Sequence, residues 1–530
     1  MHKTSAARRS MVAGFNGAVA TSQPLAAQAG LRMLMDGGNA VDAALAAAVA
    51  LNVVEPASTG IGGDAFALVY KAADRQVYAL NASGRAPYAA TREYFAGRGM
   101  SAMPPRGILA VTVPGAAAGW ADLAARFGVL GLDRLLQPAI SYAEQGFPVS
   151  ERISSGWARA AHILRQNGET ARVFLQGGGA PRTGARFTNP DLAKTLRLVA
   201  DQGPDAFYRG PIAEAIVRTS DRMGGLLTMQ DLAAHRSTWV EPIHTDYRGY
   251  RVYQCPPPGQ GISALMALNI LQGYPLVSMG FDSVDTLHVK MEAIKLAMTD
   301  SARYVADPEQ AQVPVAGLLS NGYAEQRRSE IRMDRAISLP RPGSPPLHSD
   351  TVYVSAVDGE GNACSFINSL YMAFGSGITA DGTGVLLQNR GANFNLNASH
   401  PNCIAPNKRP FHTIIPAMVT RDGDLSICYG VMGGFVQPQG HVQVLTNIVD
   451  HGMSPQEALD APRFAFQHGN LFHLEPYFPP KVYPYLRERG HSIPDVEGYF
   501  GGGQVIMIDP ESGALLAGSE PRNDGAAVAF

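Results

Sequence analysis

Residues 331–369 read IRMDRAISLPRPGSPPLHSDTVYVSAVDGEGNACSFINS, and the character of the chain changes within them at Thr351. Four prolines precede that threonine, and proline resists both helix interiors and central strands. Residues 331–350 are therefore predicted to form an exposed connector that favours polyproline II. From Thr351 the residues alternate with a period of two, 358–362 supply turn residues, and a second β run covers 363–369. The sequence thus predicts a hairpin whose first strand starts directly after an irregular connector.

On both sides of this hairpin the chain alternates between strand and helix patterns. A helix is expected from Pro24 to about Met35 with Ser22 as its cap, and Asn39 is expected to cap an Ala-rich helix over 40–53. The segment Thr228-Met-Gln-Asp231 has the form of a capping box. Further strands are expected at 18–21, 65–70, 76–80, 384–387, 415–420 and 425–429, a helix at 439–450, and a buried helical stripe at Leu287, Met291, Ile294 and Met298. Mixed helices and antiparallel hairpins favour a layered α/β sandwich over a Rossmann fold.

Composition narrows the classes of protein to which the chain can belong. With 530 residues, 46% of them hydrophobic and 17% charged, it can bury a large core. The formal net charge of -2, without runs of like charge, argues against a nucleic-acid partner. The four cysteines lack the spacing of a zinc site or a disulfide framework, and we expect them to be buried or half-buried: Cys255, Cys364, Cys403 and Cys428.

The sequence carries no signal for a membrane or for a cofactor. No stretch of 18 apolar residues predicts a membrane span, and polar residues interrupt the start of the chain, so we do not expect a secretory signal. We expect a cytoplasmic protein. Neither a phosphate-binding glycine loop nor a strand-linked Rossmann glycine motif occurs. We therefore expect neither a metal nor a cofactor.

Six blocks of sequence, in order over nearly the whole chain, carry a more specific signal. They are residues 11–66, which end in GIGGDAF; NASGRAP at 81–87; CPPPG at 255–259; DTVYVSAVDGEGNA at 350–363; APNKRPFHTIIPAM at 405–418; and GVMGGFVQPQGH at 430–441. Together they resemble the γ-glutamyltransferase family of N-terminal-nucleophile hydrolases, in a non-classical branch that includes oxamate amidohydrolase and cephalosporin acylase. The resemblance implies a four-layer αββα sandwich.

The resemblance also implies a precursor that cuts itself between Asp350 and Thr351. Residues 1–350 then become a large chain that ends in the connector, and 351–530 become a small chain of the same domain. A threonine hydroxyl is a weak nucleophile and needs a base beside it. Once Thr351 is N-terminal, its own α-amine, with an ordinary pKa of about 8, can be that base. No separate histidine is then required, and no GxSxG motif occurs.

Further site residues follow from the same resemblance. Ser369 stands where the family has a second hydroxyl bonded to the nucleophile. Gly433 and Gly434 stand where it has backbone donors for the oxyanion. Arg85 matches the arginine that grips the substrate carboxylate with a planar fork, which lysine cannot reproduce.

Several positions depart from the family pattern. Asn393 stands where γ-glutamyl enzymes have an acidic residue for the substrate ammonium, Arg390 replaces a neutral side chain, and Tyr371 replaces a small amide. His412 and Thr413 replace a serine pair. The stretch from 394 to 406 is shorter than in lid-bearing members, which predicts an open pocket mouth. Such a pocket suits an acyl group that bears a carboxylate and lacks the amine.

We therefore expect an autoprocessed threonine amidohydrolase that cleaves small carboxylated amides, of the oxamate or the glutaryl type, through an acyl-enzyme. A glutathione hydrolase or γ-glutamyltransferase acting on γ-glutamyl amides is the alternative. An uncleaved, inactive binding scaffold is a remote alternative, which a gel with two fragments would exclude. The expected partners are the small-molecule substrate and the two chains of the same precursor, which can assemble further. No nucleic acid and no membrane are expected as partners.

Overall fold

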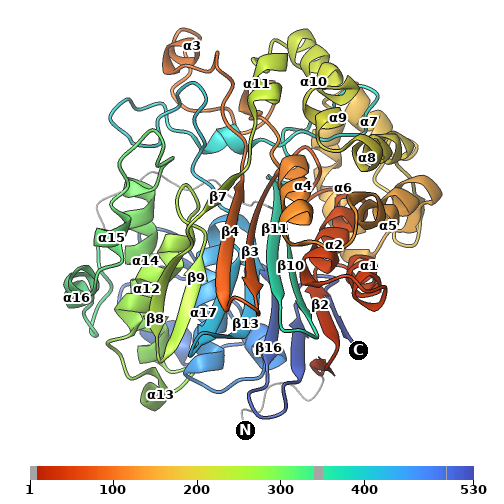
Figure 1. Cartoon of the computed structure of the whole chain (residues 1–530). Coiled ribbons are helices and arrows are strands. Elements are labelled where there is room, and N and C mark those ends of the chain that lie inside the picture. Colours follow the sequence, from red (N-terminus) through yellow and green to blue (C-terminus); the bar gives the residue numbers. More distant parts are fainter. Residues whose placement is uncertain (1–8, 339–349, 497) are drawn as a thin grey trace.

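The computed structural model describes residues 9–338, 350–496 and 498–530. Within these residues, two β-sheets of seven strands each are stacked, and helices cover the outer face of each sheet (Figure 1). This four-layer αββα arrangement confirms the layered α/β sandwich expected from the sequence. None of the described helices combines the length and the apolar composition needed to cross a membrane.

The first sheet contains the strand that starts at the predicted nucleophile. In spatial order its strands are β18 (Ala526–Ala529), β2 (Gly17–Thr21), β10 (Asp350–Asp358), β11 (Ala363–Tyr371), β3 (Asp64–Lys71), β4 (Gln76–Ala82) and β7 (Thr238–Val240). The second sheet has the order β1 (Val12–Gly14), β17 (Leu515–Ser519), β16 (Gly502–Ile508), β13 (Asp424–Met432), β12 (Ala417–Arg421), β9 (Tyr250–Gln254) and β8 (Ile243–Tyr247). Neighbouring strands run antiparallel throughout both sheets.

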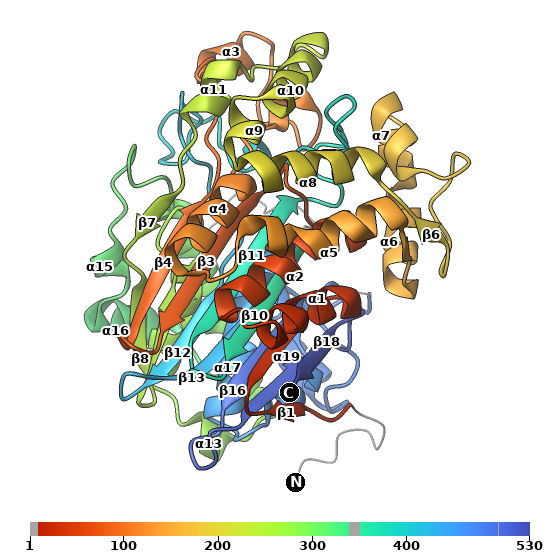
Figure 2. The same cartoon turned by 45° about the vertical axis from the view of Figure 1, so that its right-hand side comes forward.

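Helices form the two outer layers. Those on the side of the first sheet are seen in Figure 2 and comprise α1 (Pro24–Met35), α2 (Ala40–Val54), α4 (Ala116–Phe127), α5 (Leu132–Gln145), α6 (Glu151–Leu164), α7 (Gly168–Phe174), α8 (Pro190–Gln202), α9 (Asp205–Tyr208), α10 (Pro211–Arg222) and α11 (Met229–Ala234). Those on the other side are α12 (Gly261–Leu271), α14 (Val284–Tyr304), α16 (Asn321–Glu330), α17 (Gln437–Val449), α18 (Pro455–Asp460) and α19 (Val482–Glu488). The remaining elements are short: α3 (Arg92–Ala96), η1 (Ile108–Ala110), β5 (Phe147–Pro148), β6 (Arg186–Phe187), α13 (Leu276–Met279), α15 (Val315–Leu318), η2 (Arg390–Asn393), η3 (Gly434–Val436), β14 (Phe464–His468) and β15 (Leu471–Leu474).

The parts of the chain before and after Thr351 share the first sheet. β10 and β11 form the predicted hairpin near its centre, with β2 on one side and β3 on the other (Figure 1). In this register Val354 is opposite Thr21, and Ser369 is opposite Asp64. A cut before Thr351 would therefore leave the two fragments joined by backbone hydrogen bonds on both sides of the hairpin.

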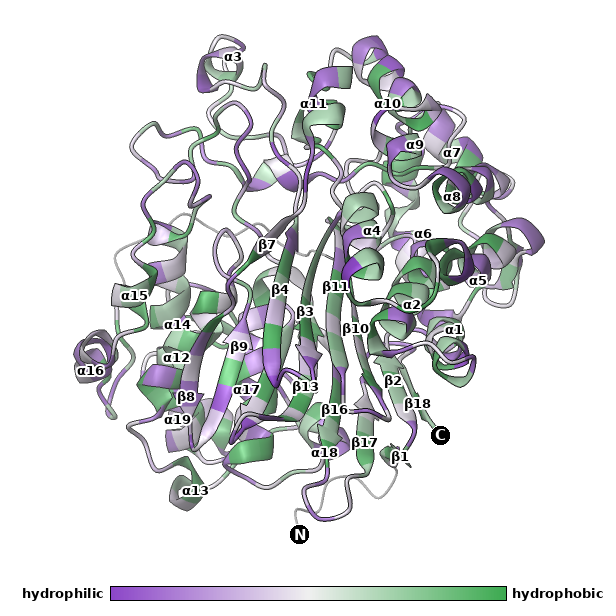
Figure 3. Cartoon of the chain, viewed as in Figure 1, coloured by the Kyte–Doolittle hydropathy of each residue, from purple (hydrophilic) through white to green (hydrophobic). Residues whose placement is uncertain are grey.

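Apolar side chains pack the hairpin from both faces. Every residue of the Ala-rich helix α2 is buried, and its small side chains allow a close approach to β10 and β11. Figure 3 shows that these strands are largely apolar. A separate apolar layer, which includes Phe66, Tyr353, Ile367 and Met418, fills the space between the two sheets. Close packing on both faces limits the movement of the strand that carries Thr351.

Most of the predicted helix ends are confirmed, and one differs. Asn39 and Thr228 form complete capping boxes at the starts of α2 and α11. Ser22 does not cap α1. The Gln23 side chain instead accepts hydrogen bonds from the first backbone N–H groups of that helix, while the Ser22 hydroxyl donates to Glu55.

Of two further expectations, one is wrong and the other stays a prediction. Residues 384–387 form no strand, because their backbone groups bond back to residues 376–380 within one loop. The predicted polyproline II connector cannot be compared, since residues 339–349 lie outside the described residues. Its first part is held in place: the backbone N–H of Ile337 donates to Glu292, and its carbonyl accepts a hydrogen bond from Lys295.

Candidate active site

The predicted nucleophile lies at the start of β10, beside the second predicted hydroxyl. Thr351 Oγ1 and Ser369 Oγ are 3.1 Å apart, which is within hydrogen-bonding distance for a pair of buried hydroxyls. The backbone N–H of Tyr371 donates to Ser369 Oγ at 2.9 Å. The hairpin register therefore brings Thr351 and Ser369 together, as the sequence predicted.

Tyr371 ends β11 in a strained backbone conformation. Its φ angle is 81°, a left-handed value that costs a non-glycine residue about 1–3 kcal/mol. The ring lies against the guanidinium of Arg390, whose Cζ is 4.6 Å from the ring centroid, a cation–π contact. Tyr371 thus connects the hydroxyl pair, through its backbone, to the arginine, through its ring.

Arg390 is a fully buried arginine with spare hydrogen-bond donors. Its Nη1 donates to Thr413 Oγ1 at 2.7 Å, whereas Nε and Nη2 have no hydrogen-bond partner among the residues that the structure describes. Burial lowers the pKa of Arg390 to about 10, so the guanidinium stays charged at neutral pH. A buried polar group without a partner costs about 1–3 kcal/mol. A bound anion would remove that cost by accepting charge-assisted hydrogen bonds.

A buried carboxylate that the sequence analysis missed balances this charge. Asp64 accepts hydrogen bonds from His412 Nε2 at 3.0 Å, from Gln388 Nε2 at 2.9 Å and from the backbone N–H of Gly84. Although burial raises the pKa of Asp64, the bond from His412 and the charge of Arg390 lower it below its ordinary value. Burial and Arg390 lower the pKa of His412 to about 4, so this imidazole is neutral at pH 7. The signal that could have revealed Asp64 is its acidic side chain within the apolar, glycine-rich GIGGDAF block.

The predicted oxyanion loop requires glycine for geometric reasons. Gly433 and Gly434, between β13 and α17, have φ angles of 125° and 58°. A Cβ atom on Gly433 would lie 2.7 Å from a ring carbon of Tyr499, closer than packed atoms approach each other. The role of their N–H groups as oxyanion donors stays a prediction.

Two predicted substrate-binding residues are engaged by other groups. Arg85 Nη2 lies 2.9 Å from Glu309 and its Nη1 lies 3.7 Å from Asp307, with 17% of the arginine side chain exposed. Asn393 Nδ2 donates to the Phe411 carbonyl at 3.1 Å. A substrate carboxylate at Arg85 would therefore compete with carboxylates that are already in place.

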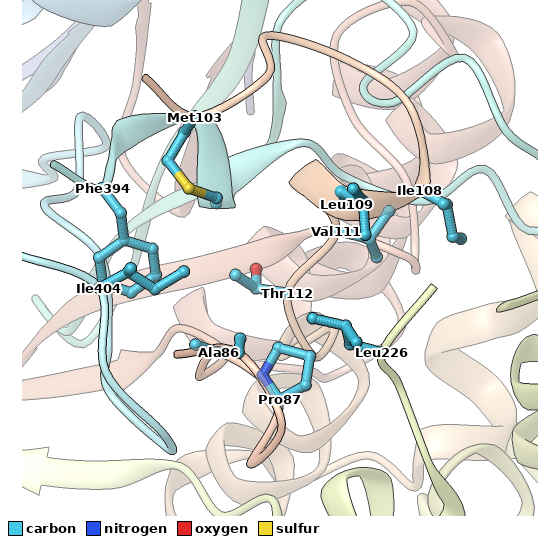
Figure 4. Close-up of a pocket in the computed structure, with 12 residues that line it drawn as sticks. Ala86, Pro87, Met103, Ile108, Leu109, Val111, Thr112, Leu226, Phe394 and Ile404 are labelled. Atoms are coloured by element: carbon cyan, nitrogen blue, oxygen red, sulfur yellow. The ribbon is translucent and has the colours of Figure 1, made fainter. Parts of the chain in front are cut away.

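Thr351 and Arg390 are both buried in this structure, and the open mouth expected from the short 394–406 stretch stays a prediction. Thr351 is 1% exposed and Arg390 0%. The stretch turns Phe394 and Ile404 inward, where they line an apolar cavity next to η2 (Figure 4). The cavity has a volume of about 10 Å³, which is room for about one water molecule. Because no charged side chain lines it, this cavity cannot hold a substrate carboxylate.

One group of side chains among the described residues has the composition of a metal site, namely His288, Glu292 and His491. The Glu292 carboxylate already has a cation beside it, since Lys295 Nζ lies 2.6 Å from its Oε1. The two nitrogens of His288 face His491 and the Arg332 carbonyl, each at 2.8 Å. We therefore assign the cluster to fastening the start of the connector, and it shares no residue with the site around Thr351.

Two stacked antiparallel sheets between helical layers, with paired hydroxyls at the start of a central strand, define the class of N-terminal-nucleophile hydrolases. Residues 26–530 match the family described as gamma-glutamyltranspeptidase, and the chain belongs to this family. The glutathione hydrolase-like YwrD proenzyme of Bacillus subtilis is 40% identical over 526 residues, which are 98% of this chain and 99% of that protein. The oxamate amidohydrolase proenzyme of Klebsiella pneumoniae is 36% identical over 522 residues, 96% and 97% of the two chains.

A solved structure gives the same assignment. The cephalosporin acylase from Bacillus halodurans is 46% identical and superposes with a TM-score of 0.94, covering 100% of this chain and 99% of that one. The chain is therefore an enzyme, an amidohydrolase of the N-terminal-nucleophile type.

Arg85→Lys is expected to raise the KM for a carboxylated amide by less than about threefold, because Glu309 and Asp307 already hold the guanidinium. The resemblance alone implied a larger rise. Steady-state kinetics with a glutaryl anilide measure the change, and the pattern of fragments on a gel serves as the control for folding. A tenfold rise in KM would place the substrate carboxylate at Arg85.

Proposed function

We propose that this protein is an autocleaving threonine amidohydrolase for small amides whose acyl group bears a carboxylate. The observation that carries the proposal is Arg390, a buried guanidinium with unpaired donors among the described residues, which Tyr371 links to the hydroxyls of Ser369 and Thr351. Parallel N–H donors of an arginine match the two oxygens of a planar carboxylate. Relatives named oxamate amidohydrolase and cephalosporin acylase support this class of substrate.

Self-cleavage between Asp350 and Thr351 comes first. It is supported by the names of the relatives, which call them proenzymes. The Thr351 hydroxyl attacks the carbonyl carbon of Asp350, the peptide bond becomes an ester, and water hydrolyses the ester. The new α-amine of Thr351 has an ordinary pKa of about 8. It can take the hydroxyl proton in every later turnover.

Turnover then uses the same hydroxyl on an external amide. Thr351 Oγ1 attacks the scissile carbonyl carbon, the leaving amine receives the proton as the C–N bond breaks, and water hydrolyses the acyl ester that remains on Thr351. The tetrahedral intermediate carries a negative oxygen. Backbone N–H groups of Gly433 and Gly434 would stabilise it, and one such donor typically contributes about 3 kcal/mol.

The charges of the site disfavour a γ-glutamyl acyl group. Its α-ammonium would meet the Arg390 guanidinium, and Asn393 would receive it in place of an acidic side chain. A hydrogen bond between charged groups contributes about 1.5–3 kcal/mol, so its loss lowers kcat/KM by about one to two powers of ten. An acyl group with the carboxylate but without the amine avoids this loss.

Oxamate and glutaryl amides both meet this requirement. In oxamate the carboxylate adjoins the scissile carbonyl. The guanidinium that binds this carboxylate must therefore lie close to Thr351. Tyr371, which contacts both Ser369 and Arg390, holds these groups near each other. Ammonia release from oxamate, measured beside amine release from glutaryl and γ-glutamyl anilides, tests the proposal. A preference for the γ-glutamyl compound would favour the second candidate, a glutathione hydrolase, which the similarity to the YwrD protein supports.

Asn393→Asp is expected to raise kcat/KM for a γ-glutamyl anilide relative to the glutaryl anilide by about tenfold, because a carboxylate restores a charged partner for the substrate ammonium. Both substrates are measured on both proteins, since specificity is a ratio. The gain is partial because the guanidinium of Arg390 still repels the ammonium. An unchanged ratio would show that Asn393 does not contact the substrate amine.

A further inference from the structure

Gln260 is a fully buried glutamine at the point where three segments of the site meet. It precedes α12, directly after the CPPPG block. Its side-chain Nε2 donates to the carbonyl of Thr413 and to the carbonyl of Gly434, each at 2.7 Å. Its backbone N–H donates to the carbonyl of His412 at 2.9 Å. One residue therefore fastens the start of α12 to both the pocket loop and the oxyanion loop.

The chemistry of the contacts settles the orientation of this amide. Two carbonyl oxygens can only accept hydrogen bonds, so the group between them must be the NH₂ and not the oxygen. Both amide hydrogens are then used. Gln260 Oε1 is buried and has no hydrogen-bond partner within the described part of the chain, so the bonds to the two loops are the side chain's hydrogen bonds in this structure.

The two loops that Gln260 joins hold the two recognition elements of the proposed reaction. Thr413, whose carbonyl Gln260 binds, accepts a hydrogen bond from Arg390 through its hydroxyl. Gly434, whose carbonyl Gln260 also binds, belongs to the predicted oxyanion loop. The amide therefore links the loop of Thr413, the hydrogen-bond partner of Arg390, to the predicted oxyanion loop.

We propose that Gln260 is a positioning residue that fixes the position of the oxyanion loop relative to the Thr413–Arg390 pair. This inference rests on the proposed function, because it takes the roles of Gly434 and Arg390 from there. Removing the amide takes away the Gln260 donor at the Thr413 carbonyl and one of the donors at the Gly434 carbonyl, which also accepts a hydrogen bond from the backbone N–H of Gln437. The two loops then lose the bonds that join them, and the loops are expected to shift. A displacement of about 1 Å in a positioned group is enough to cost about a hundredfold in rate.

The test replaces Gln260 by methionine, which has a similar length and volume but no N–H donor. The amount of cleaved enzyme is measured from the small-chain band on a gel, and kcat is calculated per cleaved enzyme. Incomplete processing then does not lower the measured kcat. The substrates are glutaryl anilide and valeryl anilide, which have the same chain length and differ in the terminal carboxylate. Gln260→Met is expected to lower kcat on both by about 100-fold, and to reduce the preference for the glutaryl compound.

Gln443 provides a matched control. It is buried in α17, and its Nε2 also donates to two backbone carbonyls, those of Gln439 at 3.1 Å and Phe464 at 3.0 Å. Gln443→Met is expected to lower the melting temperature by a similar amount but to change kcat by less than about twofold. A purely structural role for Gln260 would make the two variants alike.

The outcomes separate the two proposals. An unchanged kcat per cleaved Gln260→Met enzyme overturns the inference about Gln260, whatever the melting temperature. If wild-type enzyme does not prefer glutaryl to valeryl anilide, the proposed carboxylate site fails, while a fall in kcat of the variant would still support the link to the oxyanion loop. Should Gln260→Met yield no cleaved enzyme, Gln260→Asn, which keeps the amide on a shorter side chain, is measured in the same way. Its kcat should fall by at least about tenfold, and a wild-type kcat would again overturn the inference.

Discussion

Thr351→Ala should leave the 56.3 kDa chain uncut and inactive. The unaltered protein should separate into polypeptides of about 37 and about 19 kDa, which correspond to residues 1–350 and 351–530. Turnover in the variant is expected to fall by at least about 10⁴-fold, as when the nucleophile of other hydrolases is removed. Denaturing gels, N-terminal sequencing of the small chain and amine release from glutaryl anilide measure these results. The sequence read should be Thr-Val-Tyr-Val-Ser.

Two variants on the same strand control for the loss of a hydroxyl. Ser355 is also buried in β10, and its hydroxyl donates to the Cys428 carbonyl at 3.1 Å. Ser355→Ala should be cut and active, because this hydroxyl is not in the site. Thr351→Ser keeps a nucleophilic oxygen and should be cut and active at a reduced rate. Wild-type turnover in Thr351→Ala would remove Thr351 from the mechanism.

Arg390→Gln should lower kcat/KM for glutaryl anilide by about 100-fold, while kcat/KM for valeryl anilide falls by less than about threefold. The reason is that glutamine removes charge-assisted bonds worth about 1.5–3 kcal/mol each, at about 1.4 kcal/mol per power of ten. Valeryl anilide has no carboxylate, so it makes no such bond that the substitution could remove. Steady-state kinetics on both anilides measure the ratio. An equal loss on both would assign Arg390 to holding the site together and not to binding the carboxylate.

The same variant should also change the pH dependence. The charge of Arg390 lowers the pKa of both Asp64 and His412, so removing it raises both values. If turnover requires ionised Asp64 and neutral His412, the acidic limb of the pH profile for valeryl anilide moves to higher pH. Asp64 keeps its hydrogen bonds from His412, Gln388 and Gly84, so the folded protein should persist in the variant. A profile that does not move would show that the Asp64–His412 pair takes no part in turnover.

Local signals were sufficient for much of the fold. Alternation from Thr351 and the turn residues at 358–362 predicted the hairpin, the pair Thr228 and Asp231 predicted a capping box, and Asn39 was predicted as a helix cap. The prediction of a strand at 384–387 was wrong for a local reason and a tertiary one. Gly384 has a φ angle of 68°, and its Cα lies so close to the backbone of Leu192 that a Cβ would be 2.5 Å from its nitrogen. Apolar composition alone does not reveal either constraint.

The sequence by itself determined the family, the sandwich class and the position of the candidate nucleophile, since these depend on motifs and on patterns within a few residues. Only the tertiary structure decided which arginine has donors to spare. Arg85 is held by Glu309, which is 224 residues away, while Arg390 keeps two nitrogens without hydrogen bonds within the described part of the chain. The counter-charge at Asp64 likewise depends on His412, 348 residues distant. Whether a buried polar group has a hydrogen-bond partner depends on which residues packing brings next to it. These partners lie far apart in the sequence, so local sequence patterns do not reveal them.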